Sequence, residues 1–175
     1  MKGMITLSIL LMVLGVGAAI WKKRELPQSI SAMVYLLPEG GSRWLWTLWL
    51  MVVGVMTFAP AIDILDPIGY GYLGFAPMVT IGFVAVWPLF DVEHRTHHNV
   101  LGIMSGILSQ VCVALIGPWW LLCWLLMAGV MAWCAMHGGR GRVRTLFSDG
   151  CGVLVSEMIC WASVNAAYIT HYLTT

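Results

Sequence analysis

Asp91-Val92-Glu93-His94-Arg95-Thr96-His97-His98-Asn99 is the most polar stretch of this chain, and it lies between two long apolar runs. It holds two carboxylates, one arginine and three of the five histidines, although 60% of the 175 residues are hydrophobic. A short polar stretch between apolar runs of membrane-spanning length predicts a loop that joins two transmembrane helices at one face of a bilayer.

The composition of the whole chain supports a membrane protein. Only 10% of the residues are charged, against roughly 25% in an ordinary soluble domain, and the mean hydropathy is +0.87. A soluble domain of this size could not cover so much apolar surface. The net charge of +1 provides no basic face for nucleic acid. The lipid bilayer is therefore the expected partner, and a nucleic-acid partner is not expected.

Six apolar runs are long enough to cross the bilayer as helices. Residues 26–38 are too short to span, but Ile30, Met33 and Val34 repeat at helical spacing there, which predicts an interfacial or re-entrant helix. Residues 137–150 are rich in Gly and Arg and are predicted to form a loop. The predicted fold is all-α, a single integral membrane domain over residues 1–175, with spans at 4–21, 44–65, 69–90, 100–116, 119–136 and 151–173.

The distribution of basic residues predicts the orientation in the membrane. Basic residues gather on the cytoplasmic side of membrane proteins. All but Lys2 of the nine Lys and Arg residues fall in the odd-numbered loops between spans. We therefore expect a multi-pass protein of a bacterial inner membrane, with both termini outside and the histidine-rich loop in the cytoplasm. The basic residues of the odd loops are Lys22, Lys23, Arg24, Arg43, Arg95, Arg140, Arg142 and Arg144.

The histidine-rich loop is a candidate metal site. Neutral imidazoles of His94, His97 and His98 could share zinc or iron, with Asp91 or Glu93 completing the ligand set. The spacing HxxHH resembles one histidine box of the membrane fatty-acid desaturases and hydroxylases, which implies iron at the cytoplasmic face. Those enzymes spread more histidines over three boxes than this chain contains, so a di-iron desaturase is not expected.

The same residues are similar to the zinc site of the ceramidase- and adiponectin-receptor-like membrane hydrolases. That similarity implies one zinc between the three histidines, with Asp91 and either Ser29 or Ser31 nearby. However, that family spreads its ligands over several helices and carries HxxxH in its last span, where this chain has only His171. The alternative is a solvated loop without metal, whose histidines pair with Asp91 and Glu93 and respond to pH.

Two further features lie within the spans. Glu157 is the acidic residue deepest in a predicted span, and a carboxyl group there is a functional candidate by default. It could carry protons or bind a cation near Ser156 and Asn165, or it could be a protonated group that bonds a facing helix. Gly102 and Gly106 form a small-residue stripe suited to close helix contact, including contact within a homo-oligomer.

The segment from Leu26 to Trp119 resembles an uncharacterised group of small polytopic membrane proteins of gut bacteria and their phages. The resemblance is carried by Ser29-Ile30-Ser31-Ala32, Tyr35-Leu36-Leu37, Pro88-Leu89-Phe90, Glu93 and His98. It implies a membrane location and no particular activity. We therefore expect a non-catalytic transport, carrier or scaffold component. A metal-dependent lipid hydrolase at the cytoplasmic face and a pH- or lipid-responsive accessory protein are the alternatives.

Overall fold

The computed structural model describes residues 1–23, 28–37, 41–90, 95–148 and 152–175. Within these residues there are helices and no strands, and six helices are long and apolar enough to cross a membrane. The predicted all-α membrane fold with six spans is thereby confirmed. The elements are α1 (Lys2–Lys23), η1 (Ser31–Leu36), α2 (Gly41–Leu65), η2 (Asp66–Ile68), α3 (Tyr72–Phe90), α4 (Arg95–Ile116), η3 (Pro118–Cys123), α5 (Trp124–Ser148) and α6 (Gly152–Thr174).

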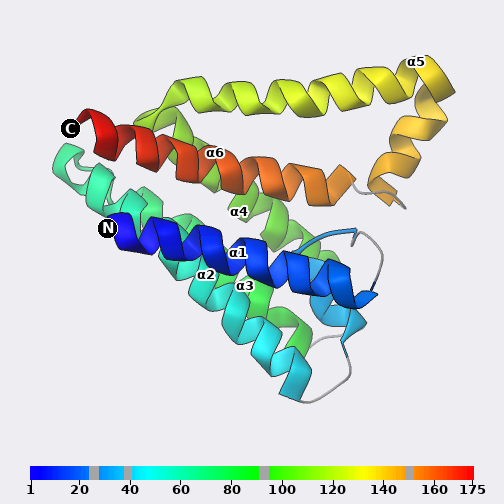
Figure 1. Ribbon diagram of the computed structural model, residues 1–175, viewed down its shortest axis with the longest axis horizontal. Helices are drawn as coiled ribbons and strands as arrows, with labels where there is room; N and C mark the ends of the chain where they lie inside the picture. The colour runs from blue at the N-terminus through cyan, green and yellow to red at the C-terminus, as the bar shows by residue number, and fades with distance from the viewer. Residues whose placement is uncertain (24–27, 38–40, 91–94, 149–151) are drawn as a thin grey trace.

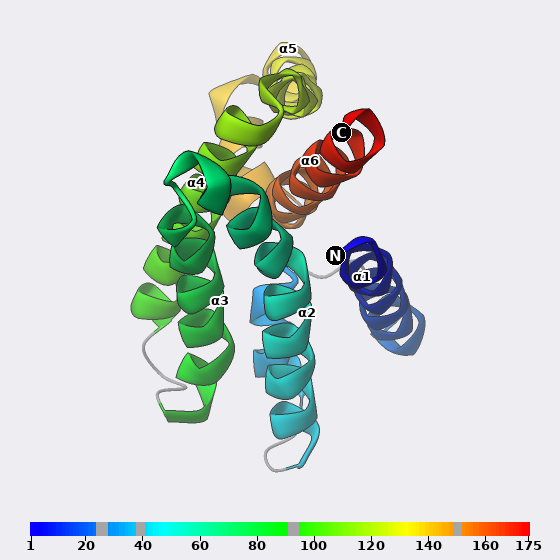
Figure 2. The ribbon, with the colours of Figure 1, turned by 90° about the vertical axis from the view of Figure 1, so that its left-hand side faces the viewer.

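Five of the long helices form the body of the molecule, and α5 lies at its edge. Helix α2 packs against α1 and α3, while α4 packs against α3 and α6. Helix α6 packs against α1 and α4 and runs between α5 and α1 in Figure 1, while α5 contacts the body through α6 and η3 (Figures 1 and 2). Both termini lie at the same end of the bundle, as an even number of spans requires (Figure 1).

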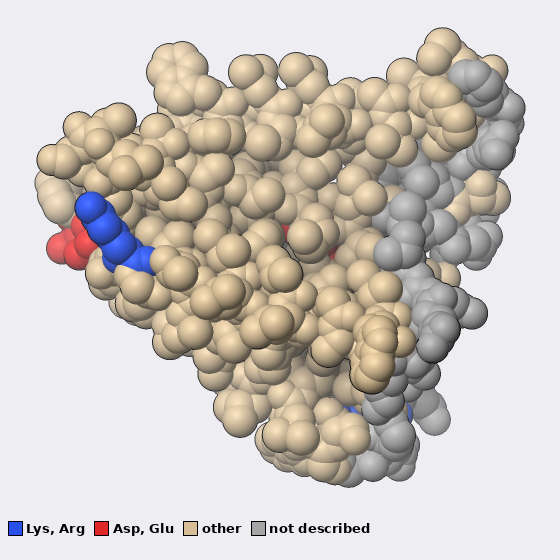
Figure 3. Space-filling view, viewed as in Figure 1, with Lys and Arg blue, Asp and Glu red and all other residues tan. Residues whose placement is uncertain are grey.

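Apolar side chains cover much of the outer surface of these helices. Leu14 is 66% exposed, Ile103 64% and Leu126 69%. Apart from charged atoms at one end and small traces near the middle and the lower edge, the described part of one broad face carries no charge (Figure 3). Helices that are apolar on their outer as well as their inner side are stable in lipid, because their backbone hydrogen bonds are satisfied internally.

Helix α1 approaches α2 closely because residue 15 has no side chain. A Cβ atom at Gly15 would lie 2.3 Å from the ring of Trp49. The indole nitrogen of Trp49 also donates a hydrogen bond to the carbonyl oxygen of Leu11, at 3.0 Å. The Trp49 side chain thus joins α1 to α2.

Two predicted helix boundaries are wrong. Helix α4 begins at Arg95, so His97, His98 and Asn99 belong to a helix and not to a loop. Helix α5 continues to Ser148 and includes most of the predicted 137–150 loop. Apolar composition marks only the part of a helix that lies in hydrocarbon, so polar turns beyond it are missed. Each glycine in a helix lowers helix stability by only about 1 kcal/mol relative to alanine. A helix that is already formed can therefore continue through such residues.

The short segment after α1 is buried between helices. Residues 28–37 (the η1 segment) contain a 3-10 helix at Ser31–Leu36, where an α-helix over 26–38 was predicted; residues 26, 27 and 38 lie outside the described part of the chain. The apolar side chains of Ile30, Met33 and Val34 are at most 5% exposed, and η1 contacts α2 and α3. A helix lying flat on the membrane surface would turn these side chains to lipid, so the burial favours an inserted segment.

Helix α3 contains two prolines, and α4 satisfies the carbonyl group that each one frees. A proline has no backbone N–H to offer the carbonyl oxygen four residues earlier, which is Leu73 for Pro77 and Val84 for Pro88. The thiol of Cys112 lies 3.4 Å from the Leu73 oxygen, and Nδ1 of His98 lies 3.1 Å from the Val84 oxygen. Both freed carbonyl groups of α3 therefore lie near polar side chains of α4.

We expect His98→Ala to lower the stability of the folded protein by about 1–2 kcal/mol, because it leaves the buried Val84 carbonyl without this partner. The variant Pro88→Ala restores an N–H at that turn, so the same histidine change should cost less in its background. The measurement is a double-mutant cycle by reversible unfolding in mixed micelles. His97→Ala, at the exposed neighbouring position, is the matched control. Equal costs of His98→Ala in the two backgrounds would contradict the assignment.

Candidate functional site

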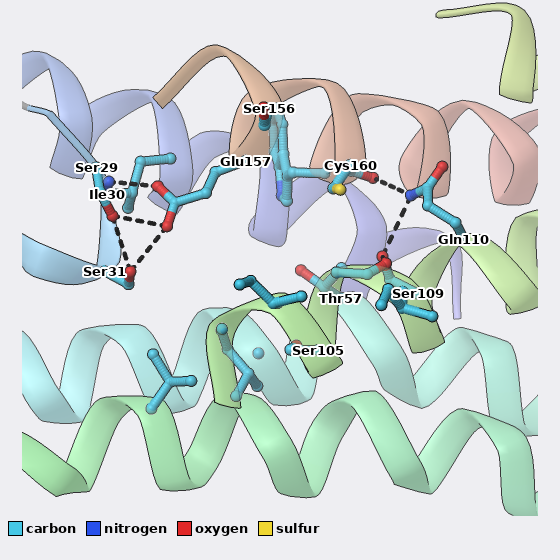
Figure 4. A pocket seen from close by; sticks show the side chains of 18 of the residues that line it. Ser29, Ile30, Ser31, Thr57, Ser105, Ser109, Gln110, Ser156, Glu157 and Cys160 are labelled. Carbon is cyan, nitrogen blue, oxygen red and sulfur yellow. Dashed lines mark hydrogen bonds between the residues drawn. The ribbon is translucent and has the colours of Figure 1, made fainter. Parts of the chain in front are cut away.

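A cavity of about 910 Å³ lies among the η1 segment, α2, α4 and α6. Most of its lining is apolar, with aromatic side chains from Phe58, Trp124 and Trp161. Figure 4 shows its polar side chains arranged along α4 and α6, with the η1 segment at one end. These polar lining residues are Gln28, Ser29, Ser31, Thr57, His98, Asn99, Ser105, Ser109, Gln110, Ser156, Glu157 and Cys160.

The carboxyl group of Glu157 accepts three hydrogen bonds at one end of the cavity. One carboxyl oxygen, Oε1, lies 2.8 Å from the hydroxyl oxygen of Ser29 and 2.8 Å from that of Ser31. The other, Oε2, accepts a hydrogen bond from the backbone N–H of Ile30. The two serine oxygens are 2.9 Å apart. These four residues, here called the Glu157 cluster, join α6 to a segment more than 120 positions earlier in the chain (Figure 4).

The backbone of the η1 segment adds a second link to α6. The N–H of Leu154 donates to the carbonyl oxygen of Gln28, at 2.9 Å. Leu154 lies in the first turn of α6, where N–H groups have no partner inside the helix. The η1 segment thus closes the N-terminal end of α6 and places its serines beside Glu157. This geometry explains why a short, irregular segment can lie among membrane helices.

Gln110 forms a separate polar connection in the middle of the bundle. Its amide nitrogen donates to the Cys160 carbonyl and lies 3.2 Å from the Ser109 hydroxyl. Its amide oxygen accepts hydrogen bonds from the indole of Trp124 and the hydroxyl of Ser163. The side chain therefore joins α4, α5 and α6, and both of its polar atoms are engaged in structural contacts.

The predicted neighbours of Glu157 are not its partners. Ser156 donates to the Gly152 carbonyl and Asn165 to the Trp161 carbonyl, so both side chains bond their own helix. The predicted Gly102 and Gly106 stripe is only partly a helix contact. A Cβ atom at Gly106 would meet the Cys160 sulfur at 3.7 Å, whereas one at Gly102 would meet nothing within 4 Å. Both glycines border the cavity.

The predicted metal site falls partly outside the described chain, since Asp91, Glu93 and His94 lie there. His97 is exposed, and its ring centroid lies 5.0 Å from that of Trp87. His98 is buried and directed at the Val84 carbonyl. In the part of the chain that is described, no three His, Cys, Asp or Glu residues are grouped to hold a metal ion. Zinc or iron binding by this stretch stays a prediction.

Sequence reasoning found Glu157 but not the residues that bind it. Ser29 and Ser31 were associated with the histidines, yet their hydroxyl groups contact the carboxyl group of α6. The signal that could have connected them is a pair of serines, separated by one residue, in a short apolar segment that must offer hydrogen bonds inside a membrane. The pairing itself depends on the fold, because no local pattern links residue 30 to residue 157.

Comparison with models of protein families, with curated proteins and with solved structures finds no match to this chain. The resemblance of residues 26–119 to small membrane proteins of gut bacteria and phages therefore stays a prediction.

Replacement of Glu157 by leucine should release the η1 segment from α6. We expect the Ile30 amide to exchange hydrogen about 10-fold faster or more in Glu157→Leu, because it loses a buried partner worth about 1–3 kcal/mol. Hydrogen–deuterium exchange of peptides covering residues 28–37 measures this effect in detergent or nanodiscs. Ser156→Ala, one position away and bonded only to its own helix, should leave the exchange unchanged. Equal exchange in Glu157→Leu and the native chain would contradict the described contact.

Proposed function

We propose that the protein is a small membrane carrier or binding component that holds a mostly apolar molecule in the cavity beside the Glu157 cluster. The supporting observation is the cavity of about 910 Å³ itself. Ligand pockets of drug-sized molecules typically have volumes of about 300–1,000 Å³, mainly apolar walls and a few fixed polar groups. This cavity has all three properties, and the Glu157 cluster supplies the fixed polar group.

The proposed ligand enters from the lipid. Ile103, Ile107 and Val111 line the cavity and are also 64%, 61% and 39% exposed on the surface of the helix bundle. They lie at successive turns of α4. The cavity is thus continuous with an apolar surface of the kind that lipid covers, and this continuity favours a ligand that partitions into the bilayer.

The orientation in the membrane is part of the proposal. By the positive-inside rule, the basic residues of the odd loops favour an orientation with the end of the bundle that carries the η1 segment in the cytoplasmic half of a bacterial inner membrane and both termini outside. Carrier or binding activity is favoured over lipid hydrolysis because the hydroxyl groups of Ser29 and Ser31 both contact the carboxyl group of Glu157. A hydrolase of the zinc type would need a serine near its metal ligands.

Filling the cavity should block entry of apolar molecules. Trifluoromethyl-phenyldiazirine, a small apolar photoreactive probe, partitions into bilayers and labels the side chains it touches. In proteoliposomes we expect it to label Cys160 and Trp161, which line the cavity, and also the exposed Leu126. Gly102→Leu should lower labelling of Cys160 and Trp161 several-fold and leave labelling of Leu126 unchanged, because leucine would occupy open cavity space.

Gly82→Leu is the matched control, since a Cβ atom at Gly82 also meets nothing within 4 Å and this glycine does not line the cavity. The probe should label this variant at the same side chains and to the same extent as the native chain. Labelling is read by peptide mass spectrometry after irradiation. Native protein without label at Cys160 and Trp161, or equal loss of label in the two leucine variants, would reject the proposed cavity function.

A further inference from the structure

Among the described residues that line the cavity, Glu157 is the acidic residue and His98 is the basic residue. No lysine, arginine or aspartate is found in this lining. Glu157 is partly exposed there. When Glu157 is ionised, the cavity therefore carries a negative charge. The described lining contains no basic side chain other than the imidazole of His98, which is directed at the Val84 carbonyl.

The number of hydrogens in the Glu157 cluster bears on the charge of the carboxyl group. Oε1 of Glu157 and the hydroxyl oxygens of Ser29 and Ser31 form a triangle with edges of 2.8, 2.8 and 2.9 Å. Each serine hydroxyl has a single hydrogen to donate. With Glu157 ionised, at most two of the three edges contain a hydrogen. With Glu157 protonated, a ring of three donated hydrogen bonds is complete.

The membrane environment makes neutralisation of this carboxyl group favourable. Three donors stabilise the ionised form, but they are neutral and cannot cancel its charge. A charge inside the bilayer is costly unless it is paired. A proton on Glu157 provides one solution, and the three oxygen–oxygen distances of 2.8, 2.8 and 2.9 Å are compatible with it. A cation in the adjoining cavity provides the other.

The rest of the cavity suits a cation with apolar substituents. Phe58, Trp124 and Trp161 line it, and aromatic faces attract cations as well as apolar groups. The mostly apolar lining and the volume of about 910 Å³ leave room for a body much larger than a metal ion. An anionic head group would face the carboxyl group of Glu157 without a lysine or arginine in the described lining.

We propose that the cavity binds lipophilic cations, such as amines or phosphonium-like molecules with apolar substituents, in exchange for the proton of Glu157. The inference rests on the proposed carrier function and names its substrate class. When the cation enters, one proton leaves Glu157 for water, so the charge of the site does not change. Proton and cation compete for the same carboxyl group, and cation binding strengthens as the pH rises.

The groups that face Glu157 from each neighbouring element are few. The η1 segment contributes the hydroxyls of Ser29 and Ser31 and the amide of Ile30. On α6 the thiol of Cys160 lies one turn away, and His98 of α4 lines the same cavity. The described cavity residues of α1 and α2 contain no titratable side chain; they are Met12, Leu50, Val53, Gly54, Thr57 and Phe58.

Three probes of similar chemistry and different charge test the inference: tetraphenylphosphonium, its anionic isostere tetraphenylborate and neutral triphenylphosphine oxide. Binding to purified protein in nanodiscs is measured by equilibrium dialysis, with empty nanodiscs as the blank. Proton release is measured with an indicator dye at low buffer concentration. We expect the phosphonium to bind more tightly than the borate and to release up to one proton per molecule bound in the pH range where Glu157 is protonated.

Glu157→Gln keeps the shape of the side chain and an acceptor for the Ile30 amide, but it removes the exchangeable charge. It should weaken phosphonium binding by about 10-fold or more and abolish the proton release, while binding of the neutral phosphine oxide changes little. Gly82→Leu, at a glycine that does not line the cavity, should behave as the native chain does. Hydrogen exchange of residues 28–37 verifies that the glutamine variant keeps the η1 segment in place.

The outcomes separate the two proposals. In one outcome, Gly102→Leu removes phosphine oxide binding, and phosphonium binding is equal in the native and Glu157→Gln proteins. This result would overturn the cation inference and retain the cavity function. Phosphonium binding without proton release at every pH would also overturn it. If none of the three probes binds above the blank, both proposals fail.

Discussion

The absence of water inside the bilayer governs this structure, because every backbone N–H and C=O group there needs a partner within the protein. The long helices meet that demand locally over most of their length, and three places in the described part of the chain draw on another helix. Pro77 and Pro88 each free a carbonyl group in α3, and the η1 segment has too few residues for an ordinary helix. In each place the missing partner comes from another helix, namely Cys112 and His98 of α4, and Glu157 and Leu154 of α6.

Under the same constraint, the hydrogen bonds of His98 and those of Glu157 differ in how fully they explain the residue. Nδ1 of His98 lies 3.1 Å from the Val84 carbonyl, and this contact gives the buried imidazole a structural role at the Pro88 turn. Glu157 is not explained as fully by its structural role. An amide or a hydroxyl group could accept the Ile30 N–H without bringing a charge into the membrane. A carboxyl group at this position, beside a cavity and bonded to two hydroxyls, has the added property that it can gain and lose a proton.

Much of the fold could be predicted from composition because lipid selects for long apolar helices. The six spans follow from the lengths of the apolar runs. The sequence also shows Gly15 and Pro88, but it does not show which residues lie against them. The extension of α4 to Arg95 and of α5 to Ser148 could not be predicted from hydropathy, since polar turns outside the hydrocarbon contribute no apolar signal. The Glu157 cluster was hidden for another reason. Its members are far apart in sequence, and only the packing of the η1 segment against α6 brings them together.

The position of the η1 segment connects stability to ligand exchange. Ser29, Ile30 and Ser31 bond Glu157 on one side and line the cavity on the other, so anything that neutralises the carboxyl group also alters the bonds that hold this segment. In the proposed exchange, a proton completes the ring of hydroxyl bonds, whereas a cation replaces that proton and leaves the two serine hydrogens to fill at most two of the three edges. Binding energy at Glu157 is therefore coupled to the packing of the η1 segment, through contacts of a single side chain. Such coupling needs no large rearrangement of the six long helices, because the segment that responds is only ten residues long.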